Sequence, residues 1–413
     1  MFFIGIDDTD SRSGQCTTYI ATKLAEKLSR YTVISELRLV RLNPTVPWKT
    51  RGNGAVAILA KEKNIEKLKK LTLREIELNA MFDDRGTNPG VVFYAGEIPQ
   101  DFTDFYHRCL HRIVEIREAE VLAEKYGAEI VKYKNGRGII GALAAIGCKF
   151  RDFTYELIAY RKKDNWGKKR RVDKHSVFVM NAKTYPFTFD NVDYSTNRVL
   201  ITPNTPCPVL LGIRGERVGI LYQALEMLNI KEPIDTFTVF KTNQATDVHL
   251  ERVNEIKEIK EFSSVILRGR VKKKPRTIRG GHVFFELTDG KTTILCAAFE
   301  PTKDFRKIIV KLIPGDEIEV YGSVKKRTIN LEKIRVIRLV RYEERNPKCS
   351  ICGKSMESVG KGKGYRCKRC KTFAKEKVKV KVNREIEEKF YEVPPAARGH
   401  LSKPLIRFCG LVA

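Results

Sequence analysis

The sequence predicts a multidomain α+β protein, and three observations support this fold class. Strand-like and helix-like runs alternate over about the first 200 residues. Short strand-like runs with regularly spaced turn residues then occupy about residues 262–342. A cluster of four cysteines follows residue 343. A single core would be unusual at a length of 413 residues, so we expect about two to four domains.

The chain carries a large excess of basic residues. There are 78 Lys and Arg against 50 Asp and Glu, which gives a formal net charge of +28. A surface rich in Lys and Glu, as in thermophilic proteins, would raise the total charge without producing a surplus of one sign. A positive surplus attracts polyanions and is typical of proteins that contact phosphates. We therefore expect a nucleic-acid partner.

The apolar runs indicate no membrane segment. They are much shorter than a bilayer requires, and only a few apolar residues precede Asp7 at the N-terminus. We therefore expect no membrane partner, no secretory signal and a cytoplasmic location. Nothing in the sequence indicates an obligate protein partner.

The clustered cysteines have the spacing of a four-thiolate zinc ribbon. Two Cys-x2-Cys turns are separated by fourteen residues, and each turn directs two thiolates toward one point. Two matched turns argue against a redox pair, and a full set of four ligands indicates structural zinc. The predicted ligands are Cys349, Cys352, Cys367 and Cys370. The six scattered cysteines are expected to be small core residues: Cys16, Cys109, Cys148, Cys207, Cys296 and Cys409.

Residues 259–342 are predicted to form an OB-fold β-barrel that binds nucleic acid. "SSVILRGRV" supplies a first strand, "HVFFELTDG" and "TTILCAAFE" form a hairpin, and "PGDEIEVYGSV" leads to the closing strands. Adjacent residues of a strand face opposite sides, so one of Phe284 and Phe285 faces the core and the other is free to stack on a base. The alternative is a core pair surrounded by solvated lysines. The candidate RNA contacts are Lys272, Lys273, Lys274, Arg279, Phe284, Phe285, Lys325, Lys326 and Arg327.

The first strand ends in an acidic cluster. "GIDDTDS" places Asp7, Asp8 and Asp10 where a buried strand leaves its sheet, and carboxylates this close repel one another unless a cation neutralises them. Mg²⁺ with a bound nucleotide meets that requirement, since Mg²⁺ takes one or two carboxylates plus phosphate oxygens. An acidic turn with an Asx cap is the alternative, and the stretch alone does not decide between them.

Glycine-rich loops favour a phosphate site. "NPTVPWKTRGNGAVAI" places Lys49, Arg51 and Asn53 in a loop before a strand, where they are suited to hold a phosphate or carbonyl group. "RGTNPGVV" and "GRGIIGALAAIG" are two further such loops. None matches a P-loop or a GxGxxG fingerprint, so spacing alone identifies no known nucleotide-binding fold.

Together these motifs resemble the archaeal tRNA(Ile) 2-agmatinylcytidine synthetases over essentially the whole chain. The resemblance rests on "GIDDTDS" with "CTTYIA", "RLNPTVPWKTRGNGAV", "TNPGVV", "CPVLLGIRGE", the segment "GGHVFFELTDG…CAAFEPTKDFR" and the terminal ribbon. It implies an ATP-dependent ligase that joins agmatine to the 2-position of the wobble cytidine of tRNA(Ile) with a CAU anticodon. The family phosphorylates the cytidine 2-oxygen, displaces the phosphate with agmatine, converts ATP to AMP, and so allows AUA to be read as isoleucine.

The resemblance also implies an architecture. A kinase-like catalytic domain would span residues 1–192, a ferredoxin-like domain 193–258, the OB fold 259–342, and the zinc ribbon with a basic tail 343–413. Residues 60–116 could belong to the first domain, but the family places them with the second. The barrel, ribbon and tail would hold the tRNA and present the wobble base.

By the same resemblance, Asp7 and Asp8 would carry magnesium, Asp10 would support that site, and Thr18 would be phosphorylated by ATP. The residues alone favour a capping role for the Thr18 hydroxyl at a helix start. Glu216 and Trp166 are candidate agmatine contacts; alternatively, Glu216 pairs with Arg214 and Trp166 anchors a surface loop.

Two rival functions remain open from the residues. One is a non-catalytic single-stranded nucleic-acid binder in which the OB barrel and zinc ribbon act and the N-terminal domain is regulatory. It predicts tRNA binding without ATP turnover. The other is a tRNA-modifying enzyme that uses a different amine, such as the lysine-adding bacterial counterpart, although the chain has no SGGxDS-type loop.

Overall fold

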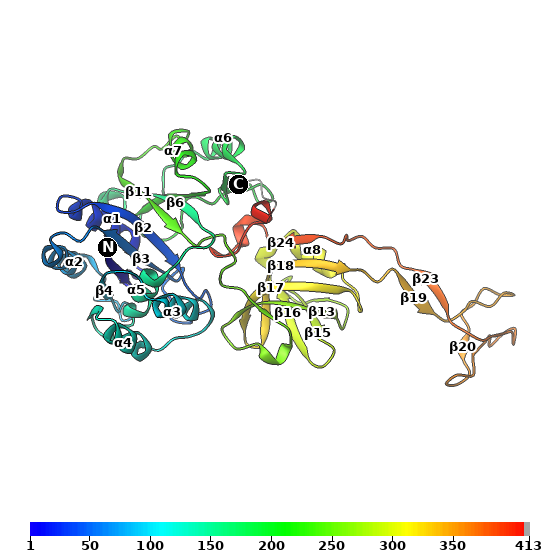
Figure 1. The fold of residues 1–413 in the computed structure, drawn as a ribbon. Helices are drawn as coiled ribbons and strands as arrows, with labels where there is room; N and C mark the ends of the chain where they lie inside the picture. Colours follow the sequence, from blue (N-terminus) through cyan, green and yellow to red (C-terminus); the bar gives the residue numbers. More distant parts are fainter. Residues whose placement is uncertain (409–413) are drawn as a thin grey trace.

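The structure, a computed structural model, describes residues 1–408 and contains a large mixed sheet, a β-barrel beside it and a slender arm (Figure 1). The large sheet has nine strands in the order β5-β4-β1-β3-β2-β11-β6-β10-β7. We call β1–β5 the first half of the sheet and β6, β7, β10 and β11 the second half. The multidomain α+β prediction is confirmed.

The first half of the sheet is built from residues before 148 and has helices on both faces. Its strands are β1 (Phe2–Asp7), β2 (Ile34–Arg41), β3 (Gly54–Ala60), β4 (Gly90–Ala95) and β5 (Glu129–Lys132). Its helices are α1 (Thr17–Leu28), α2 (Ile65–Asn79), α3 (Gln100–His111), α4 (Ile116–Lys125) and α5 (Gly138–Gly147). Alternate residues of β1 enter two different cores, since Phe2 and Ile4 pack with α1 and α2 whereas Phe3 packs with α3, α4 and α5.

The helix α5 lies directly on β1. A Cβ atom on Gly5 would lie 2.2 Å from the carbonyl oxygen of Ala142, so only glycine permits this approach. The small-residue segment predicted from "GRGIIGALAAIG" is therefore a buried helix whose backbone packs against the sheet. This packing positions the end of β1, where the acidic cluster begins.

The second half of the sheet joins the first through two parallel residue pairs between β2 and β11, Arg38 with Lys241 and Leu39 with Thr242. Its strands are β6 (Thr154–Arg161), β7 (Thr188–Phe189), β10 (Val209–Gly215) and β11 (Ile234–Thr242), and its helices are α6 (Lys174–Thr184) and α7 (Val218–Glu226). The short strands β8 (Val192–Asp193) and β9 (Arg198–Val199) pair beside it.

The pairing in the large sheet places two segments relative to its two halves. Residues 60–116 lie with the first half and not with residues 193–258, because β4 pairs with β1 along residues 2–7 and α3 packs on α5. Conversely, β6 and α6 lie within 1–192 but belong to the second half, where β6 pairs with β10 and β11. No stretch of linker-like composition marks the points at which the chain passes from one half of the sheet to the other. The limits of the domains remain a prediction.

Residues 264–338 form the predicted OB barrel. The strands β13 (Ser264–Val271), β15 (Val283–Thr288), β16 (Thr293–Ala298), β17 (Glu317–Lys325) and β18 (Thr328–Arg338) close in the order β13-β17-β18-β16-β15-β13. The helix α8 (Asp304–Val310) packs on this barrel. Three short strands extend its sheet: β12 (Glu251–Val253), β14 (Arg276–Thr277) and β24 (Phe390–Glu392).

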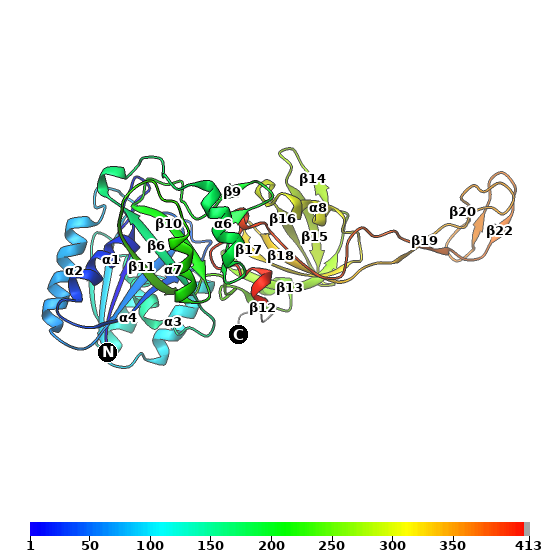
Figure 2. The ribbon, with the colours of Figure 1, turned by 90° about the horizontal axis from the view of Figure 1, so that it is seen from above.

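The arm leaves the barrel on the side away from the nine-stranded sheet, as Figure 2 shows. Its stem is β19 (Tyr342–Arg345) paired with β23 (Val378–Lys381), and its tip holds β20 (Glu357–Ser358), β21 (Tyr365–Arg366) and β22 (Phe373–Ala374). The chain then returns through β24 to the nine-stranded sheet (Figure 1).

The scattered cysteines occupy different environments. Cys109, Cys148, Cys207 and Cys296 are buried, whereas Cys16 is only partly buried and Cys409 lies outside the described residues. No helix within residues 1–408 is long and apolar enough to cross a membrane.

Candidate active site

A cavity of about 440 Å³ lies where the two halves of the sheet meet. Its wall combines the end of β1, the start of α1, the loop before β3, the start of α5, and side chains of β2, β6 and β10. All seven residues predicted as catalytic or cofactor-binding line it: Asp7, Asp8, Asp10, Thr18, Lys49, Arg51 and Asn53. The folded chain thus gathers into one cavity residues that the sequence distributes over three segments.

Asp7 is enclosed at the end of β1. A Cβ atom on Gly141 would lie 2.0 Å from its Oδ2 atom, so the glycine of α5 leaves the space that the carboxylate occupies. The backbone N–H of Asp8, a residue with a φ of 58°, donates to Oδ1 of Asp7 at 2.7 Å. Burial and the neighbouring Asp8 charge raise the pKa of Asp7 well above its ordinary value.

The other two carboxylates are paired with arginines. Asp8 Oδ2 lies 3.1 Å from Arg137 Nη2, and Asp10 Oδ2 lies 3.0 Å from Arg51 Nη2. Burial raises the pKa of Asp10 to about 6, although the Arg51 charge opposes the shift. Arg51 also donates to the carbonyl oxygens of Ser11, Gly14 and Gln15 at 2.6–3.1 Å, so it fixes the loop between the acidic cluster and α1.

Thr18 is the second residue of α1 and is buried in the cavity wall. Its Oγ1 atom lies 3.0 Å from Cys16 Sγ, and its carbonyl oxygen accepts from the Thr22 hydroxyl at 2.9 Å. The N-cap residue of α1 is Cys16, and no side-chain cap bond is found at this helix start in the described chain. The structure therefore gives the Thr18 hydroxyl a place at the cavity and not the capping contact that the residues alone favoured.

Lys49 and Asn53 lie in the loop that enters β3. Lys49 Nζ donates to the carbonyl oxygen of Pro44, and Asn53 Nδ2 donates to that of Asn43 at 3.0 Å. Burial and the nearby Lys325 charge lower the pKa of Lys49. Because Lys325 lies at the β17–β18 turn of the barrel, a basic turn of the OB fold comes close to this cavity loop.

Sequence reasoning missed the opposite wall of the cavity. Glu156 on β6 lies 3.9 Å from Arg41 Nη2 and 3.5 Å from Arg214 Nε, and it accepts from Gln244 Nε2 at 2.5 Å. His400, from the end of the chain, also lines the cavity and contacts Arg214. No local motif marks these residues, because they come from β2, β6, β10 and the C-terminal segment.

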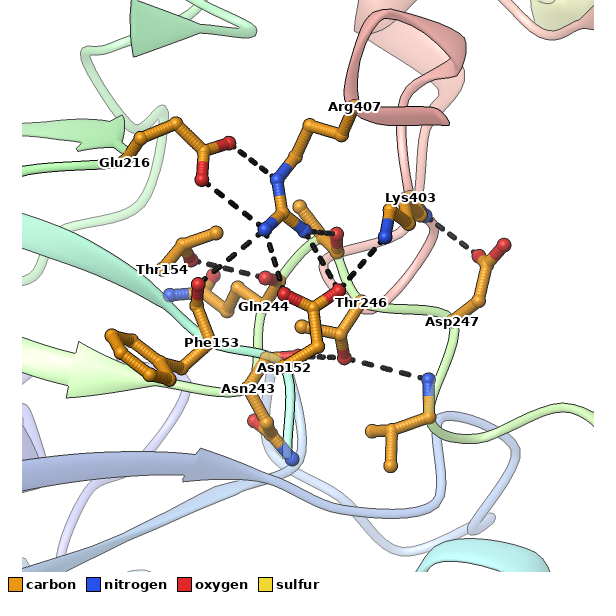
Figure 3. A network of polar contacts seen from close by, with 12 residues as sticks. Asp152, Phe153, Thr154, Glu216, Asn243, Gln244, Thr246, Asp247, Lys403 and Arg407 are labelled. Carbon is orange, nitrogen blue, oxygen red and sulfur yellow. Dashed lines mark hydrogen bonds and ion pairs between the residues drawn. The ribbon is translucent and has the colours of Figure 1, made fainter. Parts of the chain in front are cut away.

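Glu216 and Trp166 lie outside the cavity lining. Figure 3 shows the Glu216 carboxylate facing the Arg407 guanidinium, with Oε2 3.2 Å from Nη2, so its partner is Arg407 instead of Arg214. Trp166 Nε1 donates to the carbonyl oxygen of Arg161 at 3.0 Å, and the ring packs edge-on against Tyr19. These contacts anchor both side chains within the protein and away from the cavity.

The four clustered cysteines converge at the tip of the arm. The sulfur atoms of Cys349, Cys352, Cys367 and Cys370 all lie within 4.8 Å of one another. A hydrogen bond from the Thr372 hydroxyl lowers the pKa of Cys349 to about 6, whereas the contact with Cys352 raises that of Cys370 to about 12. Four thiolates this close require a cation, and a four-sulfur set fits Zn²⁺. Among residues 1–408, no other group of three or more His, Cys, Asp or Glu converges in this way.

The predicted RNA contacts lie on the barrel surface, except for one. Phe285 is buried in the barrel core, while Phe284 is partly exposed and packs edge-on against Phe299, with ring centroids 6.0 Å apart. The basic candidates are all exposed: Lys272, Lys273, Lys274 and Arg279 between β13 and β15, and Lys325, Lys326 and Arg327 at the β17–β18 turn. Lys273 is paired with Glu286 at 2.8 Å.

Four parts of the chain match known domain families. The chain matches the TiaS TCKD domain over residues 3–69, the TiaS FLD domain over 136–249, an OB-fold nucleic acid binding domain over 265–337 and the TiaS C-terminal zinc ribbon domain over 346–386. The fold and site thus define a multidomain nucleic-acid-binding protein with a charged cavity in its mixed sheet. The predicted OB fold and zinc ribbon are confirmed.

Relatives that match over nearly their whole length identify the family to which this chain belongs. The chain is 50% identical to the tRNA(Ile) 2-agmatinylcytidine synthetase TiaS of Archaeoglobus fulgidus, over 98% of this chain and 97% of the relative. It is 48% identical to that of Methanocaldococcus jannaschii, over 98% of both chains. A solved complex of TiaS with its isoleucine tRNA and ATP superposes with a TM-score of 0.89 at 48% identity, covering 98% and 97% of the chains. A complex of TiaS with the same tRNA, AMPCPP and agmatine gives 0.88 at 46% identity with the same coverage. This chain belongs to the tRNA(Ile) 2-agmatinylcytidine synthetase family.

Proposed function

We propose that this chain uses ATP to conjugate agmatine to the 2-position of the wobble cytidine of the tRNA(Ile) whose anticodon is CAU. The observation that carries the proposal is the cavity itself, which brings Asp7, Asp8 and Thr18 together, and whose Lys49 lies near enough to Lys325 of the OB barrel to sense its charge. Full-length similarity to TiaS proteins, including those solved with an isoleucine tRNA, ATP or agmatine, supports the same substrates.

The reaction needs two chemical events. The cytidine 2-oxygen is a poor leaving group, and transfer of a phosphoryl group from ATP converts it into a good one. The agmatine amine then attacks C2, the new C–N bond forms, the C–O bond breaks and phosphate leaves. Phosphoryl transfer depends mainly on alignment and charge neutralisation, which a charged cavity can supply.

Asp7 and Asp8 would hold Mg²⁺, and Asp10 would support them. The residues fit this ion, since Mg²⁺ takes one or two carboxylates together with phosphate oxygens, and burial next to Asp8 leaves the Asp7 charge poorly stabilised by the protein alone. When bound, the ion would neutralise charge on the transferring phosphoryl group. Arg51 would hold the 11–15 loop against the cluster through its ion pair with Asp10 and its bond to the Ser11 carbonyl oxygen.

Thr18 would accept a second phosphoryl group at its Oγ1 atom. The new O–P bond would form as a phosphoanhydride bond of the nucleotide breaks, and the hydroxyl proton would pass to solvent. The nucleotide, having given one phosphoryl group to the cytidine and one to Thr18, would leave as AMP. Hydrolysis of the Thr18 phosphate would then restore the hydroxyl.

The position of Thr18 at the start of α1 places it where backbone N–H groups favour phosphate. Lys49 and Asn53 would hold the nucleotide from the facing loop. The first half of the sheet would thus act as a kinase-like domain, residues of the second half would form a ferredoxin-like domain, and the protein would work in the cytoplasm.

The decisive experiment is mass spectrometry of nucleosides from an unmodified transcript of this tRNA(Ile) incubated with the protein, ATP, Mg²⁺ and agmatine. We expect a wobble cytidine heavier by agmatine less water. The adduct should be lost in Asp8→Ala and Thr18→Ala and kept in Asp83→Ala, a control at a carboxylate outside the cavity.

Two other results would change the proposal. Tight tRNA binding without any adduct would favour the non-catalytic binding protein. An adduct that forms with lysine and not with agmatine would favour a synthetase of different amine specificity.

A further inference from the structure

The last described part of the chain, residues 394–408, returns from the barrel to the nine-stranded sheet, and we call it the C-terminal strap (Figure 1). It contains two short 3₁₀ turns, Pro395–Ala397 and Leu405–Phe408. The domain matches end at residue 386, so none of them covers the strap. Its position between the sheet and the barrel raises the question of what it contributes to the cavity.

Backbone hydrogen bonds hold the strap against the loop that follows β11. The carbonyl oxygen of His400 accepts from Ala245 N at 2.8 Å, and that of Leu401 accepts from Thr246 N and Asp247 N at 3.1 and 2.8 Å. Asp247 Oδ1 in turn accepts from Lys403 N at 2.7 Å. The strap thus follows this loop over several residues and its path past the cavity is fixed.

Buried ion pairs anchor the strap on both sides of His400. Arg398 pairs with Asp190, and these side chains are 5% and 7% exposed. Arg407 pairs with Asp152 and Glu216 on the other side (Figure 3). Lys333 of the barrel is fully buried and reaches both Asp247 and the carbonyl oxygen of Lys403. The charged groups of Arg398, Arg407 and Lys333 are nearly or fully buried and would be costly if unpaired, so these ion pairs favour one position of the strap.

This path brings the His400 ring to the cavity wall. Its Nδ1 atom lies 2.7 Å from Arg214 Nη2. A Cβ atom on Gly52 would lie 3.0 Å from both His400 Nε2 and Arg41 Nη1, so the absence of a side chain at Gly52 lets the ring and the guanidinium approach the same loop. Two different nitrogen donors therefore meet beside the loop that carries Asn53.

The ring is a neutral hydrogen-bond donor in this setting. Because a guanidinium can only donate, Nδ1 must accept from Arg214, and the proton of a neutral ring then resides on Nε2. His400 is exposed, and the charges of Arg41, Arg214 and Lys49 around its ring lower its pKa well below its ordinary value. Glu156 faces the two arginines, and Asp190 lies 3.9 Å from Arg214, but the charges nearest His400 are positive.

We propose that His400, Arg41 and Arg214 form a phosphate-binding subsite of the cavity, and that the C-terminal strap completes the active site by supplying His400. The bound group would be a phosphate whose oxygens accept from His400 Nε2–H and from the Arg41 guanidinium, which has a buried Nε atom without a partner among the described residues. The inference rests on the proposed function, which brings two phosphate sources to this cavity. These are the phosphate chain of ATP and the RNA backbone next to the wobble nucleotide.

The test compares His400→Ala with His400→Gln, which keeps an N–H donor at similar reach, and with His175→Ala, a control at an exposed histidine on α6. Equilibrium binding of a non-hydrolysable ATP analogue and of tRNA(Ile) is measured separately on the full-length protein. We expect His400→Ala to weaken one of them about tenfold, His400→Gln to recover most of the loss, and His175→Ala to match the wild type.

The two sources give different results. Loss of affinity for the ATP analogue alone assigns the subsite to ATP. Loss of affinity for tRNA assigns it to the RNA backbone, provided that the slope of log K against log salt concentration also falls by about the amount expected for one phosphate contact. Unchanged affinity for both ligands in His400→Ala would overturn the proposal. So would a His400→Gln variant as defective as His400→Ala with an equally lowered melting temperature, which would indicate a structural role. Both affinities are measured without catalysis. Failure to detect the agmatine adduct by mass spectrometry would therefore overturn the proposed function without deciding whether His400 binds phosphate.

Discussion

The zinc ribbon and the cavity are assembled in opposite ways. The ribbon takes its four ligands from residues 349–370, and the buried part of its core is only Cys349, Met356 and Cys367. The cavity takes its wall from residues as distant as Asp7 and His400 and lies between large cores on both halves of the sheet. A region with so small a core depends on its metal for folding, whereas the cavity depends on the packing of both halves of the nine-stranded sheet.

Removal of zinc should have the largest effect on folding, and this effect should be confined to the arm. Structural zinc contributes about 10 kcal/mol or more to the folding of small zinc domains, so chelation or Cys367→Ser should unfold the tip of the arm around β20, β21 and β22. We expect rapid proteolysis there and weaker tRNA binding, with unchanged binding of an ATP analogue. A dye assay for released zinc and limited proteolysis measure this. A ribbon that stays protease-resistant without zinc would show that its fold does not depend on the metal.

Loss of an ion pair that anchors the C-terminal strap should instead lower the stability of the part of the molecule that holds the cavity. The Arg407 side chain is 7% exposed and contacts Asp152, Glu216 and the carbonyl oxygen of Ala245. Arg407→Ala leaves the buried Glu216 carboxylate without its cation, so we expect a loss of about 3 kcal/mol in the free energy of unfolding.

Lys403→Ala is the matched control for Arg407→Ala. Lys403 also pairs with Asp152, but both of these side chains are more exposed, at 24% and 38%. Its removal should cost less than about 1 kcal/mol. Denaturant unfolding of the two variants measures the difference. Equal losses in the free energy of unfolding would show that the burial of Arg407 does not determine how much its ion pairs stabilise the protein.

The same contrast explains what could be predicted from the sequence. The ribbon and the barrel were predictable because cysteine spacing and short-strand patterns are local features. Asp7 and Lys49 could each be singled out, since glycine-rich loops and strand ends mark such positions locally. Thr18 was indicated only by the family resemblance, because the residues around it favour a capping role.

What the sequence could not supply is the set of partners from distant segments. Glu216 bonds to Arg407, 191 residues away, and no pattern around either residue indicates it. His400 and Glu156 reach the cavity only because the strap and β6 pass it, and the placement of residues 60–116 depends on the pairing of β4 with β1. Each of these is a property of tertiary packing.

A change at the acidic cluster should separate activity from stability. In Asp7→Asn the amide cannot replace a carboxylate next to Asp8, so we expect agmatine transfer to fall by about a hundredfold or more. Burial and the Asp8 charge destabilise the Asp7 carboxylate, so the melting temperature should stay the same or rise. Single-turnover rates and thermal unfolding measure both effects. A variant that is inactive because it has unfolded would show that the Asp7 carboxylate is needed for the fold.

The smallest expected effect concerns two adjacent residues of β15 that face opposite sides of the barrel. Phe284 is partly exposed beside Phe299, which is 38% exposed, whereas Phe285 is 3% exposed and lies in the barrel core. Stacking on a base contributes about 1–3 kcal/mol, so Phe284→Ala should weaken tRNA(Ile) binding about tenfold and leave the melting temperature nearly unchanged. Phe285→Ala should lower stability by about 3 kcal/mol through the cavity it creates. Filter binding and thermal unfolding of the pair distinguish a stacking surface from a packing one. Equal tRNA affinity in Phe284→Ala and the wild type would show that the outer face of β15 does not contact RNA bases.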